Sequence, residues 1–134
     1  VYRAREDVGA EVHTDSTYAA VMSGLRGSLP PVHYMIAITG AHQVECAEYA
    51  TFGTEKLAEN AVKAMGTSKA CFLANHGLLT CGPNLKRALS VAENVEWISE
   101  LYIKAKAAGQ PVTLTEQELD DLAAGFASYG QPKK

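Results

Sequence analysis

Two short apolar runs flank a polar turn at residues 71–80, and this arrangement constrains the fold more than any other part of the chain. Residues 71–73 and 78–80 read Cys-Phe-Leu and Leu-Leu-Thr, and residues 75–77 between them read Asn-His-Gly. Two strand-like runs joined by a short turn that contains glycine predict a β-hairpin. Gly77 permits a backbone conformation that a side chain would oppose. We therefore expect a pair of strands with His76 at their turn.

A second histidine stands near the end of another strand-like segment. Residues 10–14 are predicted to form a strand that carries His13, and Asp15 follows it directly. A residue two positions along an extended chain returns to the same face. A polar break after a buried strand is a place where a fold can present imidazole nitrogens to a metal ion. His13 and His76 are therefore candidate metal ligands.

Helix signals occupy much of the remaining chain. Ser16 and Thr54 are suitable N-cap residues, and the Thr-Glu-Gln-Glu string at 115–118 is a capping box. A long segment repeats apolar residues at spacings of three and four, which is typical of an amphipathic helix. The expected helices cover residues 16–23, 55–65, 85–105 and 115–129.

Two further strand candidates complete the pattern, at residues 32–38 and 43–46, and residues 1–5 resemble the end of a helix. The order is strand, helix, two strands, helix, hairpin and two helices. This order predicts a mixed α/β fold in which helices flank a central, mostly antiparallel sheet. With 134 residues, the chain is expected to form a single domain over 1–134 that buries roughly two-thirds of its unfolded surface.

The composition excludes several classes of protein. Hydrophobic residues make up 47%, charged residues make up 20% and the formal net charge is −3, so no nucleic-acid partner is expected. No apolar run approaches the roughly 18 residues that span a bilayer, and residues 1–7 contain no secretory signal. We expect a cytoplasmic protein with no membrane partner. The three cysteines form no Cys-x-x-Cys pair and are expected to be reduced structural thiols.

Four strings taken together resemble the class II aldolase/adducin family. They are Val-His-Thr-Asp-Ser at 12–16, Val-His-Tyr-Met-Ile at 32–36, Tyr-Ala-Thr-Phe-Gly-Thr at 49–54 and Asn-His-Gly at 75–77. The resemblance runs from about Tyr2 to Tyr129. The second and third strings favour the aldolase branch of the family over the related ribulose-phosphate 4-epimerases.

The resemblance implies a zinc site. Family members carry His-x-His followed later by His-Gly, and the three imidazoles hold Zn²⁺ with coordination positions left open for substrate. Carried over, His13 and His76 are ligands, but Asp15 stands where the family has the second histidine. Aspartate is a legitimate zinc ligand, although its shorter side chain is expected to weaken binding. Asp15 is also a good capping residue for the following helix, and both interpretations stay open.

The resemblance also implies roles for three aromatic residues. Tyr34 and Tyr129 match tyrosines that can donate a proton, Tyr129 by reaching the site of a neighbouring subunit, and Phe52 matches a wall of the substrate pocket. His33 and His42 are expected to lie on a strand face and in a loop, and not to bind metal. The implied assembly is a homo-oligomer, a cyclic tetramer.

The implied activity is zinc-dependent aldol cleavage of a ketose 1-phosphate, a small sugar phosphate, to dihydroxyacetone phosphate and an aldehyde. The family's phosphate-binding loops and catalytic glutamate precede the first residue of this chain, so the fold is expected to be incomplete at its N-terminus. Glu6, Asp7 and Glu11 do not match that glutamate, and the chain alone is expected to be weakly active or inactive. The alternatives are a non-catalytic adducin-like relative, a truncated fragment and a sugar-phosphate 4-epimerase.

Overall fold

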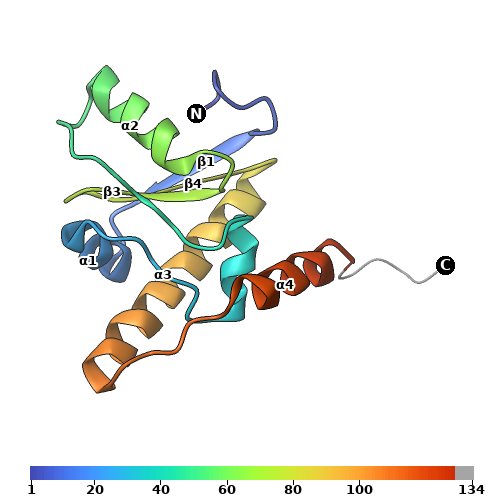
Figure 1. Ribbon diagram of the computed structural model, residues 1–134. Helices are drawn as coiled ribbons and strands as arrows, with labels where there is room; N and C mark the ends of the chain where they lie inside the picture. Colours follow the sequence, from blue (N-terminus) through green and yellow to red (C-terminus); the bar gives the residue numbers. More distant parts are fainter. Residues whose placement is uncertain (129–134) are drawn as a thin grey trace.

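The computed structural model describes residues 1–128, which form a small sheet with helices on both faces (Figure 1). Within residues 1–128 there are four α-helices, four strands and one 3₁₀ helix, η1. In chain order the elements are β1 (Ala10–Thr14), α1 (Thr17–Leu25), η1 (Tyr34–Thr39), β2 (Cys46–Ala47), α2 (Glu55–Met65), β3 (Ala70–Leu73), β4 (Gly77–Gly82), α3 (Leu85–Ala108) and α4 (Glu116–Ser128).

The strands form one mixed sheet in the order β1-β4-β3-β2. β4 pairs antiparallel with both β1 and β3, and β2 pairs parallel with β3. The predicted mixed α/β fold with a mostly antiparallel sheet is therefore confirmed. Within the described residues, no helix is both long enough and apolar enough to cross a bilayer.

Alternating side chains of the sheet enter two separate cores. Phe72 and Leu78 face the larger core, where they meet buried residues of α1 and α3. Cys71 and Cys81 face the smaller core beneath α2. Because successive residues of a strand point to opposite faces, the fully buried β3 requires a layer of helices on each side. Figure 1 shows α2 on one face and α1 and α3 on the other.

Two of the three predicted capping signals make the expected hydrogen bonds, whereas Ser16 is the N-cap residue of α1 but its side chain makes no capping bond. The Thr54 hydroxyl accepts a hydrogen bond from the Leu57 amide at 3.3 Å, and Gly66 ends α2 with a positive φ of 53°. At the start of α4, the Glu118 amide donates to Thr115 Oγ1 at 3.2 Å, while Glu118 Oε2 accepts from the Thr115 amide at 2.7 Å. These reciprocal bonds are those of a capping box.

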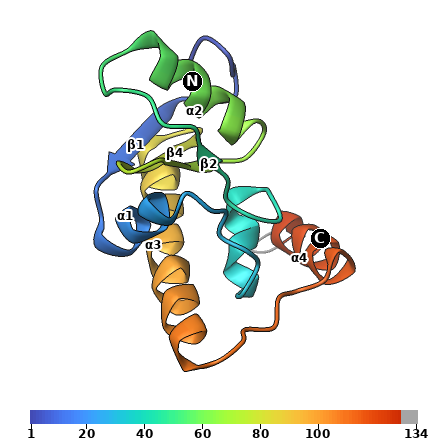
Figure 2. The same ribbon diagram turned by 60° about the vertical axis from the view of Figure 1, so that its left-hand side comes forward.

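The predicted strand at 32–38 is wrong, because this segment forms η1, which packs against α3 and α4 (Figure 2). The His33 ring accepts a hydrogen bond from the Met35 amide and so caps a helical turn. Ile36 and Thr39 are the buried positions, and their spacing of three matches a 3₁₀ helix. The strand expected at 43–46 is displaced to Cys46–Ala47, and residues 1–5 form a hydrogen-bonded turn.

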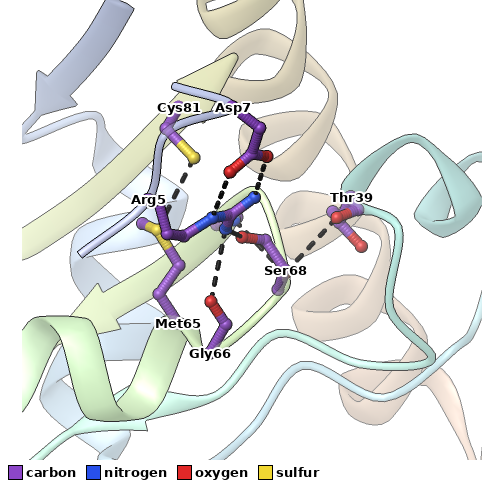
Figure 3. Close-up of polar contacts among 8 residues, drawn as sticks. Arg5, Asp7, Thr39, Met65, Gly66, Ser68 and Cys81 are labelled. Carbon is purple, nitrogen blue, oxygen red and sulfur yellow. Dashed lines mark hydrogen bonds and ion pairs between the residues drawn. The ribbon is translucent and has the colours of Figure 1, made fainter. Parts of the chain in front are cut away.

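A polar network near the surface attaches the N-terminal segment to the body of the domain. Figure 3 shows the Arg5 guanidinium directed at the turn between α2 and β3, where it donates to the carbonyl oxygens of Gly66 and Ser68. Two further nitrogens donate to the Asp7 carboxylate at 3.1 and 2.6 Å. This hydrogen bond from Arg5 lowers the pKa of Asp7. The network fixes the approach of the chain to β1 and hence to His13.

Candidate metal centre

The pairing of β1 with β4 brings the two histidine segments together. The register places Thr14 opposite Leu78, so the C-terminal end of β1 lies beside the beginning of β4. Asp15 comes directly after β1, and His76 comes directly before β4. The β1–β4 pairing therefore brings together, at one end of these two strands, residues that are 61 or more positions apart in the chain.

Three side chains converge there with donor atoms suited to a metal ion. The ligand atoms of His13, Asp15 and His76 all lie within 4.8 Å of one another. Asp15 Oδ1 lies 3.3 Å from His13 Nε2 and 4.0 Å from His76 Nε2, and the two imidazole rings meet edge to face with centroids 4.7 Å apart. Two imidazole nitrogens and one carboxylate are a known donor set for zinc.

The orientation of His13 is fixed by the neighbouring strand. Its Nδ1 lies 2.8 Å from the carbonyl oxygen of Leu78, which can only accept a hydrogen bond. Nδ1 therefore carries a proton and donates to Leu78, and Nε2 is the ring nitrogen on the side of Asp15. Metal-binding histidines commonly donate their second ring nitrogen to a carbonyl or carboxylate in this way.

Asp15 is not needed to cap α1, because another carboxylate takes the free amides of its first turn. Ser16 is the N-cap residue and its side chain makes no capping bond. Glu96, from α3, accepts hydrogen bonds from the Tyr18 and Ala19 amides at 2.9 and 2.7 Å. The Asp15 side chain is 71% exposed and is directed toward the two histidines. This arrangement favours the ligand interpretation of Asp15 over the capping interpretation.

Gly77 is required for close packing and not for a left-handed backbone. A Cβ atom at this position would lie 2.4 Å from the Thr14 carbonyl oxygen and 2.8 Å from Asp15 Oδ1. The residue with a positive φ in this turn is Asn75, at 52°. The absence of a side chain at Gly77 thus allows the end of β1, with Asp15, to approach the turn at residues 74–76, called the histidine turn below.

The other predicted site residues lie apart from this trio or outside the described residues. Tyr34 begins η1, is half exposed and lines a hollow between η1 and α4 together with Phe126. Phe52 is 79% exposed in the turn at 51–54. Tyr129 lies outside the part of the chain that the structure describes. The predicted roles of these three aromatic residues stay predictions.

The two remaining histidines have structural contacts of their own. His33 caps η1 and its ring packs edge to face against Trp97 at 4.7 Å, so its expected place on a strand face is wrong. His42 lies in the loop after η1, as expected, and pairs with Asp120 of α4 at 3.1 Å.

Sequence reasoning missed Glu96, whose contact with α1 joins residues 77 and 78 positions apart. A glutamate in the middle of an amphipathic helix carries no local sign of such a partner. Only the packing of α1 on α3 brings its carboxylate to the Tyr18 and Ala19 amides in the first turn of α1.

Comparison with known proteins identifies the family of the chain. Residues 1–103 match the family described as the Class II Aldolase and Adducin N-terminal domain. The chain is 45% identical over 130 residues to a 5-deoxy-D-ribulose 1-phosphate aldolase of Bacillus thuringiensis serovar kurstaki, covering 97% of this chain and 61% of that protein. It is 40% identical over 131 residues to an L-fuculose phosphate aldolase of Haemophilus influenzae, with coverage of 97% and 61%.

Solved structures give the same result. An L-fuculose 1-phosphate aldolase superposes with a TM-score of 0.92 at 44% identity, covering 94% of this chain and 59% of the other. YgbL of Escherichia coli, described as a putative aldolase/epimerase/decarboxylase, superposes with a TM-score of 0.78 at 26% identity, covering 91% and 60%. The chain spans about three fifths of the length of the curated relatives it matches. It belongs to the class II aldolase and adducin family and is similar to the fuculose phosphate aldolases in that family.

Proposed function

We propose that this chain carries the metal site of a zinc-dependent aldolase that cleaves a ketose 1-phosphate to dihydroxyacetone phosphate and an aldehyde. The observation that supports the proposal most is the convergence of His13, Asp15 and His76 within 4.8 Å. The substrate class is inferred from the similar proteins, which are named as aldolases of 5-deoxyribulose and fuculose phosphates.

The three side chains would hold the ion through His13 Nε2, a carboxylate oxygen of Asp15 and a ring nitrogen of His76. The chemistry that zinc supplies at such a site is Lewis-acid stabilisation of the negative charge that develops when a carbon–carbon bond next to a carbonyl breaks. The Leu78 carbonyl orients the His13 ring, and Asp15 supplies one negative charge. The side chains of His13 and His76 are 41% and 30% exposed, so a substrate can approach the site from solvent.

Proton transfer is the second element of the proposal. Tyr34 and Tyr129 are the proposed proton donors, and Phe52 is the proposed wall of the substrate pocket. The Tyr34 side chain is half exposed and the Phe52 side chain is largely exposed, so both are accessible to a substrate or to another copy of the chain. Substitution of Tyr34 by phenylalanine removes the phenol and keeps the ring, which tests the first role without changing the packing of η1.

We also propose that the protein is a cyclic homotetramer. Apolar side chains that protrude from α1 and α3 support an assembly: Val21 is 43% exposed, Leu25 65%, Leu85 63% and Leu89 44%. Light scattering at micromolar concentration measures the molar mass directly. A monomer at that concentration would rule out the tetramer and any role of Tyr129 in a neighbouring site.

A coupled assay of dihydroxyacetone phosphate release tests the activity. Fuculose 1-phosphate and 5-deoxyribulose 1-phosphate are the substrates to compare. We expect weak or no turnover by the 134-residue chain alone. When the family's N-terminal segment is present, we expect turnover that a chelator abolishes, that zinc restores and that His76→Ala lowers by at least about 100-fold. His42→Ala removes a histidine outside the site and should leave turnover unchanged. Zinc binding without cleavage of either substrate, even with the family's N-terminal segment present, would contradict the proposal and would favour the non-catalytic alternative.

A further inference from the structure

We propose that Ser23 and Arg26, at the C-terminal end of α1, are positioning residues that hold the turn carrying His76 in the arrangement that binds metal. The inference rests on the proposed metal site and adds two residues that do not touch the ion. It follows from a set of hydrogen bonds between the end of α1 and residues 75–76, some 50 positions further along the chain.

Ser23 meets the histidine turn through two of its atoms. Its carbonyl oxygen accepts a hydrogen bond from the Asn75 amide at 3.0 Å, and its hydroxyl oxygen accepts one from the His76 amide at 3.2 Å. The side chain is itself oriented, because the hydroxyl donates to the Ala20 carbonyl at 2.7 Å. A lone pair of Oγ is therefore left for His76. Ser23 is 1% exposed, so water does not replace these bonds easily.

The same Ser23 carbonyl oxygen also makes the capping hydrogen bond at the C-terminal end of α1. It accepts a hydrogen bond from the Arg26 amide at 3.3 Å, while Arg26 adopts a left-handed backbone with φ of 54°. A carbonyl has two lone pairs, so one oxygen can bind both the Arg26 and the Asn75 amides. The end of α1 and the turn before β4 thus share one acceptor.

Arg26 and Asn75 form a second connection. Arg26 Nε donates to Asn75 Oδ1 at 2.6 Å, and the Arg26 guanidinium lies over the Tyr49 ring at 5.6 Å from its centroid. Arg26 and Asn75 are the residues other than glycine with positive φ among those described, at 54° and 52°. This conformation is unfavourable for residues with a side chain and persists where surrounding contacts determine it. Here each of the two residues is bonded to the other.

Through these contacts, α1 connects Asp15 at its N-terminal end to the backbone of the His76 turn at its C-terminal end. Its N-terminal end follows Asp15 and is held by Glu96, while its C-terminal end holds the backbone of Asn75 and His76. The distance between the Asp15 carboxylate and the His76 ring therefore depends on how firmly the last turn of α1 binds residues 75–76. Groups that orient metal ligands typically change metal affinity by about 10- to 100-fold when they are removed.

Replacement of the Ser23 hydroxyl provides the main test. Ser23→Ala removes the bond to the His76 amide and leaves the backbone carbonyl in place. Ser99→Ala is the matched control, because Ser99 is also fully buried in a helix and also donates to a carbonyl one turn earlier, Val95 at 2.7 Å. We expect Ser23→Ala to weaken zinc binding by about 10- to 100-fold and Ser99→Ala to leave it unchanged, even if both variants lose similar stability.

Two glycine variants test the second connection without disturbing the backbone conformation. Arg26→Gly and Asn75→Gly each remove the side-chain bond and tolerate a positive φ. Each variant should weaken zinc binding, as Ser23→Ala does. The double variant should bind zinc no more weakly than the more affected single variant, because both substitutions remove the same Arg26–Asn75 hydrogen bond. Ser23→Thr keeps a hydroxyl oxygen and should recover part of the affinity that Ser23→Ala loses.

Amide hydrogen exchange of the metal-free protein supplies a readout that does not depend on zinc. We expect the His76 amide to exchange faster in Ser23→Ala than in the wild type, and to be unchanged in Ser99→Ala. Zinc binding by Ser23→Ala equal to that of the wild type, or unchanged exchange at His76, would overturn the positioning role while leaving the metal site intact. Failure of the wild-type protein to bind zinc would overturn the proposed metal site and with it the role of these residues toward a metal.

Discussion

At the scale of single residues, Asp15 is the position that distinguishes this chain from the zinc pattern it resembles. A carboxylate brings a negative charge but reaches less far from the backbone than an imidazole. In the structure Oδ1 of Asp15 already lies nearer to His13 than to His76, at 3.3 and 4.0 Å. The carboxylate therefore lies closer to one histidine than to the other.

Replacement of Asp15 by histidine should tighten zinc binding, because the longer side chain restores the three-imidazole set that the family resemblance implies. Competition with a chromophoric chelator measures the affinity. Asp15→Asn has the size of the native residue but lacks the charge, and should bind more weakly than the wild type. Equal affinities for Asp15→His and the wild type would show that this backbone does not accommodate a third imidazole.

Gly77 makes a separate prediction. An alanine Cβ would lie 2.4 Å from the Thr14 carbonyl oxygen, so β1 and the histidine turn must move apart. We expect Gly77→Ala to destabilise the fold by about 1–3 kcal/mol and to weaken zinc binding. Gly24, within α1, has nothing within 4 Å of an added Cβ, and Gly24→Ala should stabilise the protein by about 0.5–1 kcal/mol. Chemical denaturation compares the two variants, and equal stabilities would contradict this packing.

At the scale of elements, a side chain of α3 caps the N-terminal end of α1. The N-cap Ser16 makes no side-chain bond, and the Glu96 carboxylate supplies the acceptors for the Tyr18 and Ala19 amides. A negative charge at a helix N-terminus is also favoured by the helix dipole. This contact both docks α1 on α3 and leaves the carboxylate of Asp15 for the two histidines.

Glu96→Ala should therefore destabilise the protein by about 1–2 kcal/mol, as the loss of a helix cap does. Glu96→Gln keeps an acceptor oxygen and should cost less. Glu93→Ala changes an exposed glutamate of the same helix and serves as the control. Thermal unfolding gives the order of stabilities, and a Glu96→Ala variant as stable as Glu93→Ala would contradict the capping role.

The elements that the sequence predicts well are those whose signals are local. β1 and α2 have the predicted bounds, since alternation, an N-cap threonine and a terminal glycine are contained within each segment. The segment at 32–38 was mispredicted as a strand because an apolar run does not distinguish a strand from a short buried helix. Its conformation depends on the His33 ring and on packing against α3 and α4.

The residues of the proposed metal site also differ in how well the sequence identifies them. His13, Asp15 and His76 could be selected together from the strings they occupy, and the structure brings all three to one place. Glu96, Ser23 and Arg26 could not be selected, because their contacts join segments 49 to 78 positions apart. The three proposed ligands have a sequence signature, and the proposed positioning residues do not.

At the scale of the whole molecule, the smaller core contains two of the three thiols. Cys71 and Cys81 are fully buried beneath α2, and the structure records all three cysteines as free. Burial raises the pKa of Cys71 to about 12 and also raises that of Cys81. The Cys71 thiol donates to the Ala61 carbonyl at 3.6 Å. These cysteines are therefore neutral, unreactive parts of the core, as expected from the sequence.

The raised pKa values predict that stability decreases in alkaline solution. Between the ordinary cysteine pKa of 9.0 and the folded value of about 12, the unfolded chain releases the Cys71 proton and the folded protein keeps it. The free energy of unfolding should then fall by up to about 1.4 kcal/mol per pH unit for this group, and should be insensitive to it well below pH 9. In urea titrations, the stability advantage of the wild type over Cys71→Ala should shrink as pH rises from about 8 to about 10. A constant advantage would contradict the assignment.

Zinc stoichiometry tests the central claim most directly, namely that His13, Asp15 and His76 form one metal site. Elemental analysis of the purified protein, with a chelator titration, should give one zinc ion per chain. His13→Ala and His76→Ala should each lose the ion, while His42→Ala, at the exposed pair with Asp120, should retain it. Undiminished zinc in His76→Ala would contradict the account, because the turn that Ser23, Arg26 and Gly77 hold in place would then carry no ligand.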